Sequence, residues 1–369
     1  MDTIRRFGFD KTIFFITLIL VAAGVLMVFD ASGALATEKF HRPFYFLFSQ
    51  LGGALGGIVL LLILVSVRVP FYENKIFIYG LLGVTYVLLV LCFTMPMVAS
   101  THRWVNILHV RFQPSELAKL SLILFLAHYV QRFKDRINEL KIFLPAAAVL
   151  FAAVLLILLE PDFGTAALTM VLGGLVLFLG GVCLRNFFYL GVAAVPTFLI
   201  FLVIAHYRIV RIIEFFTRNK DLDNASFQVA QSKLAVGAGG VLGTSLGEGT
   251  QKLFFLPCAH TDFIFSVIAE ELGLLGALAV LALFAIIVWR GLRISLKATT
   301  MAAQLTAAGM TFLLALQTLI NITVVLGLSP AKGVPLPLIS FGRSSLVCTI
   351  LAVAVLLHIS QRKGQARDY

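Results

Sequence analysis

Charged side chains are scarce in this sequence of 369 residues, where Asp, Glu, Lys and Arg together make up 13%. An ordinary soluble domain is about one quarter charged and about half apolar. This chain is 60% hydrophobic, and its mean hydropathy is +1.00. The shortage of charge excludes a soluble protein with a large core and indicates a chain that crosses a membrane several times.

Cysteine is also rare. The four cysteines, Cys92, Cys183, Cys258 and Cys348, are scattered and form no C-x-x-C pair, which argues against a disulfide framework and a zinc site. The sequence has no Walker-type phosphate loop, so nucleotide hydrolysis is not expected. No convincing internal repeat is present either, which weakens the case for a transporter built from inverted repeats.

Long apolar runs are abundant, and many exceed the roughly 18 residues that indicate a membrane-spanning helix. The predicted fold is an all-α polytopic membrane protein, a single domain over residues 1–369. The first run is too long for a signal-peptide core, so we interpret it as an uncleaved helix. The ten predicted spans are residues 12–29, 45–67, 76–95, 114–131, 142–159, 164–183, 187–206, 261–289, 303–327 and 341–359. A long outer loop, about residues 207–260, is expected between spans seven and eight.

The positions of the basic residues predict the orientation. Most of the 29 Lys and Arg residues lie in alternate connections and at both ends of the chain, so the positive-inside rule predicts that both termini are cytoplasmic. The net charge of +11 therefore does not indicate nucleic acid. The predicted outer segments nevertheless carry Arg103, Arg111, Arg208, Arg211, Lys332 and Arg343. These charges either contact solvent and lipid headgroups or suit an anionic substrate at the membrane surface.

Arg103-Trp104 and the run FQPSELAKL form the first polar motif. Pro114 fits the first turn of a helix. Glu116 and Lys119 are three residues apart, so they share a helix face and can pair. The pair is either a local ion pair near a helix start, or a site where Lys119 binds an anion and Glu116 orients it.

The second motif, EPDFGT, places Glu160 and Asp162 in a short outer turn. Pro161 favours the end of one helix, and Asp162 is a typical cap for the next. A hard divalent cation would also accept these carboxylates, although two are few for a metal site.

The third motif combines FQVAQSKL, which contains Gln231 and Ser232, with glycines between residues 237 and 243. Clustered glycines let backbone N–H groups approach a phosphate. In a membrane protein such a cluster is more often a plain re-entrant turn.

His260, Thr261 and Asp262 precede the eighth span, which also carries Glu270 and Glu271. Ionisable groups beside a membrane segment are costly and mark a functional site by default. The alternative is local: Thr261 caps the helix, and Asp262 lies in its first turn, stabilised by the helix dipole. For Glu270 and Glu271 we favour a structural role.

The last motif follows Asn321, where prolines and glycines between residues 327 and 345 break the helix between spans nine and ten. Irregular backbone at membrane depth is tolerated where it is buried in protein or lines a wet cavity. Lys332 and Arg343 would then face that cavity.

These motifs, RW…FQPSELAKL, EPDFGT, FQVAQSKLAVGAGG, KLFFLPCAHTDFIFSVIAEELG and PAKGVPLPLISFG, occur in an order that resembles the SEDS family (shape, elongation, division and sporulation proteins). Within it, the sequence is more similar to the division branch, FtsW, than to the elongation branch, RodA. The resemblance implies a peptidoglycan glycosyltransferase that polymerises lipid II into β-1,4 glycan strands for septal synthesis. It also implies a multi-pass protein of the bacterial cytoplasmic membrane at the septum, which works with a class B penicillin-binding protein and other division proteins.

The resemblance also implies residue roles. Asp262 falls on the position of the family's general base, and an inverting transfer would release undecaprenyl diphosphate. Basic groups or a divalent cation, Mg²⁺ or Mn²⁺, would neutralise that leaving group. The predicted substrate-binding residues are Lys119 and Lys332 first, then Glu116, Arg103, Arg208, Arg211, Gln231 and Ser232.

Arg343 departs from the family, which usually has a glycine there. Either the turn loses glycine's backbone freedom, or the guanidinium adds a phosphate contact. Three other functions stay open from sequence: a RodA-like elongation polymerase, a lipid II flippase and a non-catalytic division scaffold.

Overall fold

The computed structural model describes residues 8–67, 69–96, 101–107, 110–204, 224–253, 255–330 and 333–361. Ten of its helices coincide with the ten predicted spans: α1 (Lys11–Phe40), α2 (Tyr45–Ser66), α3 (Lys75–Cys92), α4 (Pro114–Arg132), α5 (Leu140–Leu159), α6 (Phe163–Leu179), α7 (Leu184–Ile204), α10 (Ile264–Leu296), α11 (Met301–Val325) and α12 (Arg343–Gln361). Within the described residues, eight of these helices are long and apolar enough to cross a membrane by length and composition, α4 and α6 being the exceptions.

Three features differ from the prediction. Helices α1 and α10 are longer than the predicted spans, with 30 and 33 residues. A short antiparallel hairpin, β1 (Val105–Ile107) and β2 (Val110–Phe112), precedes α4. The predicted long loop contains a further helix, α9 (Asn224–Ala238), while residues 205–223 of that loop lie outside the described part. These short polar elements lack the apolar run that identifies a span, so hydropathy misses them.

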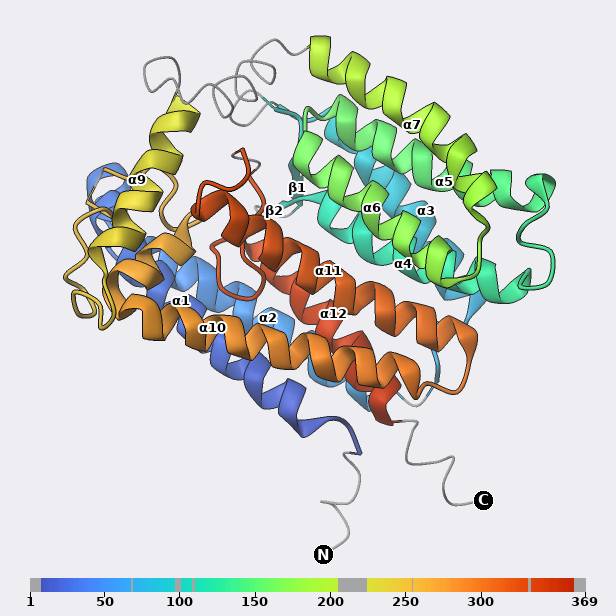
Figure 1. Cartoon of the computed structure of the whole chain (residues 1–369). Coiled ribbons are helices and arrows are strands. Elements are labelled where there is room, and N and C mark those ends of the chain that lie inside the picture. The colour runs from blue at the N-terminus through green and yellow to red at the C-terminus, as the bar shows by residue number, and fades with distance from the viewer. Residues whose placement is uncertain are drawn as a thin grey trace, which may run out of the picture.

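The helices form one bundle in which α11 and α12 are central (Figure 1). α12 packs on α2, α11 on α10 and α4, and α1 on α2 and α10. Small residues allow close contact where helices cross. Gly57 of α2 lies against Ile350 of α12, and Gly309 of α11 lies against Ile123 of α4. α7, by contrast, is largely exposed at the edge of the bundle.

The start of α1 and the end of α12 lie together at one end of the bundle (Figure 1). The backbone N–H of Asp10 donates to the Ser360 hydroxyl at 3.0 Å. α9 and the β1–β2 hairpin lie at the other end, as does the start of α10. This arrangement agrees with an even number of crossings, and it gathers the polar motifs at the end that the charge distribution predicts to face outward.

Candidate active site

Asp262 lies just before α10 rather than within its first turn. The helix begins at Ile264 with Phe263 as N-cap, and no side chain caps it. The Thr261 hydroxyl donates instead to the Cys258 carbonyl at 3.1 Å. The alternative in which Thr261 caps the helix and Asp262 lies in its first turn is therefore wrong. Cys258, with a φ of 60°, turns the chain before the helix starts. The Asp262 carboxylate therefore makes no capping hydrogen bond to α10.

Side chains from α11 and from residues 333–342 hold the backbone around Asp262. Asn321 of α11 donates from Nδ2 to the Asp262 carbonyl at 2.8 Å and to the Val334 carbonyl at 2.9 Å. The Ser340 hydroxyl donates to the Thr261 carbonyl at 2.6 Å. Residues 333–342 are the predicted break between spans nine and ten, and the structure confirms that this irregular backbone is mostly buried in protein.

Gln50 of α2 fixes the same segment from the other side, and the sequence analysis did not single it out. Its Nε2 donates to the Ser340 carbonyl at 3.1 Å, and its Oε1 accepts from the Gly342 N–H at 3.4 Å. Gln50 is completely buried. A lone amide inside a predicted apolar span was the available signal, since polar groups within spans need a partner.

The Asp262 carboxylate is half-buried, and none of the described residues donates a hydrogen bond to it. Burial raises its pKa to about 6, the Asp162 charge adds to this, and Arg103 opposes it. Most of the carboxylate is therefore ionised at pH 7. His260 is a poorer base, because burial and Lys39 lower its pKa to about 4.

Arg103 and Asp162 belong to one hydrogen-bonded turn within electrostatic reach of Asp262. Arg103 Nη1 lies 3.9 Å from Asp162 Oδ2, and Arg103 Nε donates to the Glu160 carbonyl at 3.4 Å. Asp162 caps α6, accepting from the Thr165 N–H at 3.1 Å and its hydroxyl at 2.9 Å. The predicted cap is thus confirmed, and the fold brings the first, second and fourth motifs together.

Glu160 is fully buried, and neither of its carboxylate oxygens has a hydrogen-bond partner in the described structure. Burial and the nearby Asp162 charge raise its pKa to about 8, against weaker lowering by Cys92 and Arg103. Glu160 is therefore mainly neutral at pH 7 and adds little negative charge beside Asp262.

The carboxylates near Asp262 do not form a divalent-cation site. Asp162 already accepts hydrogen bonds from Thr165 and from Gln113 Nε2, the latter at 3.2 Å. Within the described residues, no group of three or more His, Cys, Asp or Glu side chains could hold a metal ion. These side chains do not fit a preformed metal centre.

Glu116 and Lys119 form the predicted ion pair on α4, with Nζ and Oε1 2.7 Å apart. Both side chains are buried, and the Lys119 side chain is only 2% exposed. The predicted pairing is confirmed. The role of Lys119 as an anion ligand stays a prediction, because here its charge is neutralised by Glu116.

Ser232 lies in a helix interface. Its hydroxyl is buried, 2.7 Å from the Ser266 hydroxyl, and donates to the Val325 carbonyl at 2.8 Å. Gln231 beside it is half-buried. Substrate binding by these two residues stays a prediction. The other predicted ligands, Lys332, Arg208 and Arg211, lie outside the described residues.

The glycine cluster packs against α10. A Cβ on Gly243, which has a φ of 83°, would lie 2.0 Å from the Glu271 carbonyl oxygen. Glu271 pairs with Lys252 at 2.6 Å, and Glu270 accepts from the Thr250 N–H at 2.8 Å. Close packing therefore explains Gly239 and Gly243, whereas a Cβ on Gly237 or Gly240 would contact nothing within 4 Å. The structural role predicted for both glutamates is confirmed.

The bundle and its carboxylate define a class: a polytopic membrane protein with a half-buried aspartate at one end, within electrostatic reach of an arginine. The chain belongs to the FtsW, RodA and SpoVE family of cell cycle proteins, whose family model matches residues 10–365. The predicted family is thereby confirmed.

Individual relatives agree. The chain is 40% identical over 360 residues to the probable peptidoglycan glycosyltransferase FtsW of Legionella pneumophila, with 95% of this chain and 90% of that protein covered. It is 35% identical over 363 residues to stage V sporulation protein E of Bacillus subtilis, with 97% and 99% covered. A solved chain from a peptidoglycan synthase complex that coordinates polymerization and crosslinking matches with a TM-score of 0.78 at 25% identity, over 97% of this chain and 99% of that one.

Proposed function

We propose that this protein is a peptidoglycan glycosyltransferase that polymerises lipid II into β-1,4 glycan strands for septal cell-wall synthesis. Relatives that cover nearly the whole chain carry the name probable peptidoglycan glycosyltransferase FtsW. They favour the division role over a RodA-like elongation role. We place the protein in the bacterial cytoplasmic membrane at the septum.

Asp262 is the proposed general base. Its carboxylate takes the proton from the acceptor sugar's 4-hydroxyl as that oxygen attacks the anomeric carbon of the donor. The bond from that carbon to the diphosphate oxygen breaks, and undecaprenyl diphosphate leaves with the electron pair. Attack opposite the leaving group converts an α-linked donor into a β-linked product. A base with a pKa near 6 suits this task, since it is ionised at neutral pH yet still accepts a proton.

The observation that supports this assignment is the difference between Asp262 and the other carboxylates. Asp162 caps a helix, Glu271 is paired with Lys252, and Glu160 is buried and mainly neutral. The Asp262 carboxylate is half-buried and lacks a hydrogen-bond donor within the described residues. It is therefore free to bind a hydroxyl group.

The test is polymerisation of lipid II by the purified full-length protein with its cognate class B penicillin-binding protein, followed on gels. We expect Asp262→Asn to reduce the rate on the order of 100-fold to 10,000-fold, as for loss of a general base. Asp135→Asn, which changes an exposed carboxylate remote from the site, is the matched control. Wild-type polymerisation by Asp262→Asn would refute the base assignment, and lipid II translocation without polymerisation would favour a flippase.

A divalent cation and a transpeptidase partner are parts of the same proposal. Mg²⁺ commonly binds substrate phosphates with few protein ligands, so we expect Mg²⁺ or Mn²⁺ to arrive with the diphosphate. Chelation should then slow polymerisation and leave protein stability unchanged.

The likeness to a chain of a peptidoglycan synthase complex supports a class B penicillin-binding protein as partner, which co-purification would test.

A further inference from the structure

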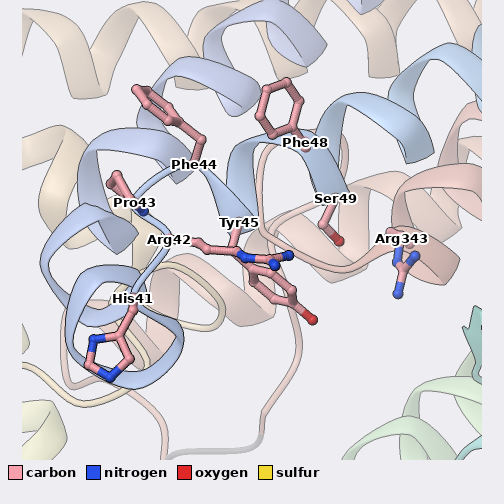
Figure 2. A pocket seen from close by; sticks show the side chains of 8 residues that line it. All are labelled: His41, Arg42, Pro43, Phe44, Tyr45, Phe48, Ser49 and Arg343. Atoms are coloured by element: carbon pink, nitrogen blue, oxygen red, sulfur yellow. The ribbon is translucent and has the colours of Figure 1, made fainter.

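A cavity of about 650 Å³ lies between the α1–α2 turn and the first residue of α12 (Figure 2). It is lined by His41, Arg42, Pro43, Phe44, Tyr45, Phe48, Ser49 and Arg343. We call it the Arg42–Arg343 pocket. It is at the same end of the bundle as Asp262, since the Phe341 N–H donates to the His260 carbonyl at 3.0 Å. Of the anion contacts considered from the sequence, only Arg343 lines it.

The two arginines of the pocket are available to a ligand. Arg42 is exposed and Arg343 is half-buried. Within the described residues neither guanidinium group makes a hydrogen bond or ion pair, whereas the side chains of Arg103, Lys119 and Lys252 are all paired. Each guanidinium offers five N–H donors in a planar fork that fits phosphate. Figure 2 shows His41, Tyr45 and Arg343 projecting to the same side of the α2 start.

Backbone at the pocket adds to this preference for an anion. α2 begins at Tyr45, and its N-cap, Phe44, makes no side-chain capping bond. α12 begins at Arg343 itself. Both long helices thus present their N-termini here, and the partial positive charge of a helix N-terminus favours an anion. Arg343 is not among the residues with positive φ. Its backbone conformation is therefore open to any residue and does not require the glycine that the family usually has there.

An apolar surface continues from the pocket along α2. Phe48, Leu55, Val59 and Ile63 are all more than half exposed, and their spacing places them on one helix face. Gly52 and Gly56 lie between them, and a Cβ on either would contact nothing within 4 Å. A cationic pocket at the top of a smooth apolar face suits an amphiphile with an anionic head and a long chain.

We propose that the Arg42–Arg343 pocket binds the phosphate group of a membrane lipid whose chain lies along α2. Two lipids share this chemistry: an anionic phospholipid, and the diphosphate-linked isoprenoid of the polymerisation reaction. The second source rests on the proposed function, whereas the first does not. Arg343 then supplies the phosphate contact that replaces the usual glycine.

The experiment measures lipid binding to the full-length protein in detergent by native mass spectrometry, with phosphatidylglycerol and undecaprenyl diphosphate titrated separately. We expect Arg42→Gln and Arg343→Gln each to weaken binding about tenfold, which corresponds to the loss of a charge-assisted hydrogen bond. Arg343→Lys keeps the charge and loses the planar fork, so it should fall between. Arg111→Gln, an exposed arginine of β2 outside the pocket, should bind as wild type.

The outcomes separate the sources. A loss confined to phosphatidylglycerol assigns the pocket to a headgroup, and a loss confined to undecaprenyl diphosphate assigns it to the reaction's lipid. Unchanged binding of both lipids by the double Arg42→Gln, Arg343→Gln variant, with an unchanged melting temperature, would overturn the proposal. Asp262→Asn should bind both lipids normally while losing polymerisation, so failure of the pocket and failure of the base are distinguishable.

Discussion

At the scale of single residues, the environment decides what each outer carboxylate does. Asp162 is held by α6 as a cap, and Glu271 by the Lys252 ammonium. Glu160 is buried without a partner and stays mainly protonated at neutral pH. Asp262 combines partial burial with the absence of a described donor, which leaves it ionised but reactive.

The rate of polymerisation should therefore fall at acidic pH. Burial and Asp162 raise the pKa of Asp262 from 3.8 to about 6. Because the base must be ionised to accept a proton, activity should be present above this value and should fall as pH falls through it. The measurement is kcat from pH 5 to pH 8. A kcat that stays constant down to pH 5 would contradict this description.

The Arg103→Gln variant tests the same dependence of kcat on pH. The Arg103 charge lowers the Asp262 pKa, so its removal should shift the acid limb to higher pH. A purely structural role of Arg103 in the 160–162 turn would lower the rate at every pH without moving the limb.

At the scale of elements, α10 is interrupted by one residue with non-helical backbone angles. Gly273 has a φ of 65° inside the helix, and residues 240–245 fit against it. The Leu274 N–H donates to the Gly240 carbonyl at 3.0 Å, and the Thr244 N–H donates to the Glu270 carbonyl at 3.1 Å. The loop after α9 thereby satisfies the backbone groups that the break frees, as buried backbone requires.

Lys252 holds this loop to α1 and α10, bonding Asp30 and Glu271 at 2.6 Å each. Burial by itself lowers the Lys252 pKa, but these hydrogen bonds raise it overall, so the side chain stays charged. Lys252→Met should destabilise the protein by about 3–5 kcal/mol, because it leaves buried carboxylates uncompensated. Denaturation in detergent measures this.

The matched control for Lys252→Met is Arg136→Met. Arg136 pairs with Glu139 at 2.8 Å, but both side chains are mostly exposed, so solvent screens the pair. No measurable change is expected. Equal effects of the two substitutions would show that the Lys252 cluster does not anchor the loop.

At the scale of the whole molecule, the candidate site is assembled from segments far apart in sequence. Gln50 of α2 and Asn321 of α11 fix residues 333–342 and the backbone of Asp262. α1 completes the arrangement, since a Cβ on Gly24 would lie only 2.6 Å from the Ile339 Cα. The position of Asp262 therefore depends on how closely α1 approaches this segment.

Gly24→Val should accordingly destabilise the protein by about 1–3 kcal/mol, as overpacking does, and should also slow polymerisation by displacing Ile339. The opposing atom belongs to backbone, so it cannot move aside cheaply. Gly33→Val in the same helix faces open space and should leave stability and polymerisation rate unchanged. Melting temperature and polymerisation rate together test this, and a Gly24→Val variant that matches Gly33→Val would disprove the packing argument.

The sequence by itself determined the helical membrane fold, the positions of the ten long helices, the Glu116–Lys119 pair and the family. These features are local, because length, hydropathy and three-residue spacing are read along the chain. Only the tertiary structure decided that Asp262 caps nothing, that the charges of Arg103 and Asp162 act on it, and that Gln50 fixes the segment beside it. Such relations join residues far apart in sequence, 290 positions for Gln50 and Ser340, and their geometry depends on how the helices pack.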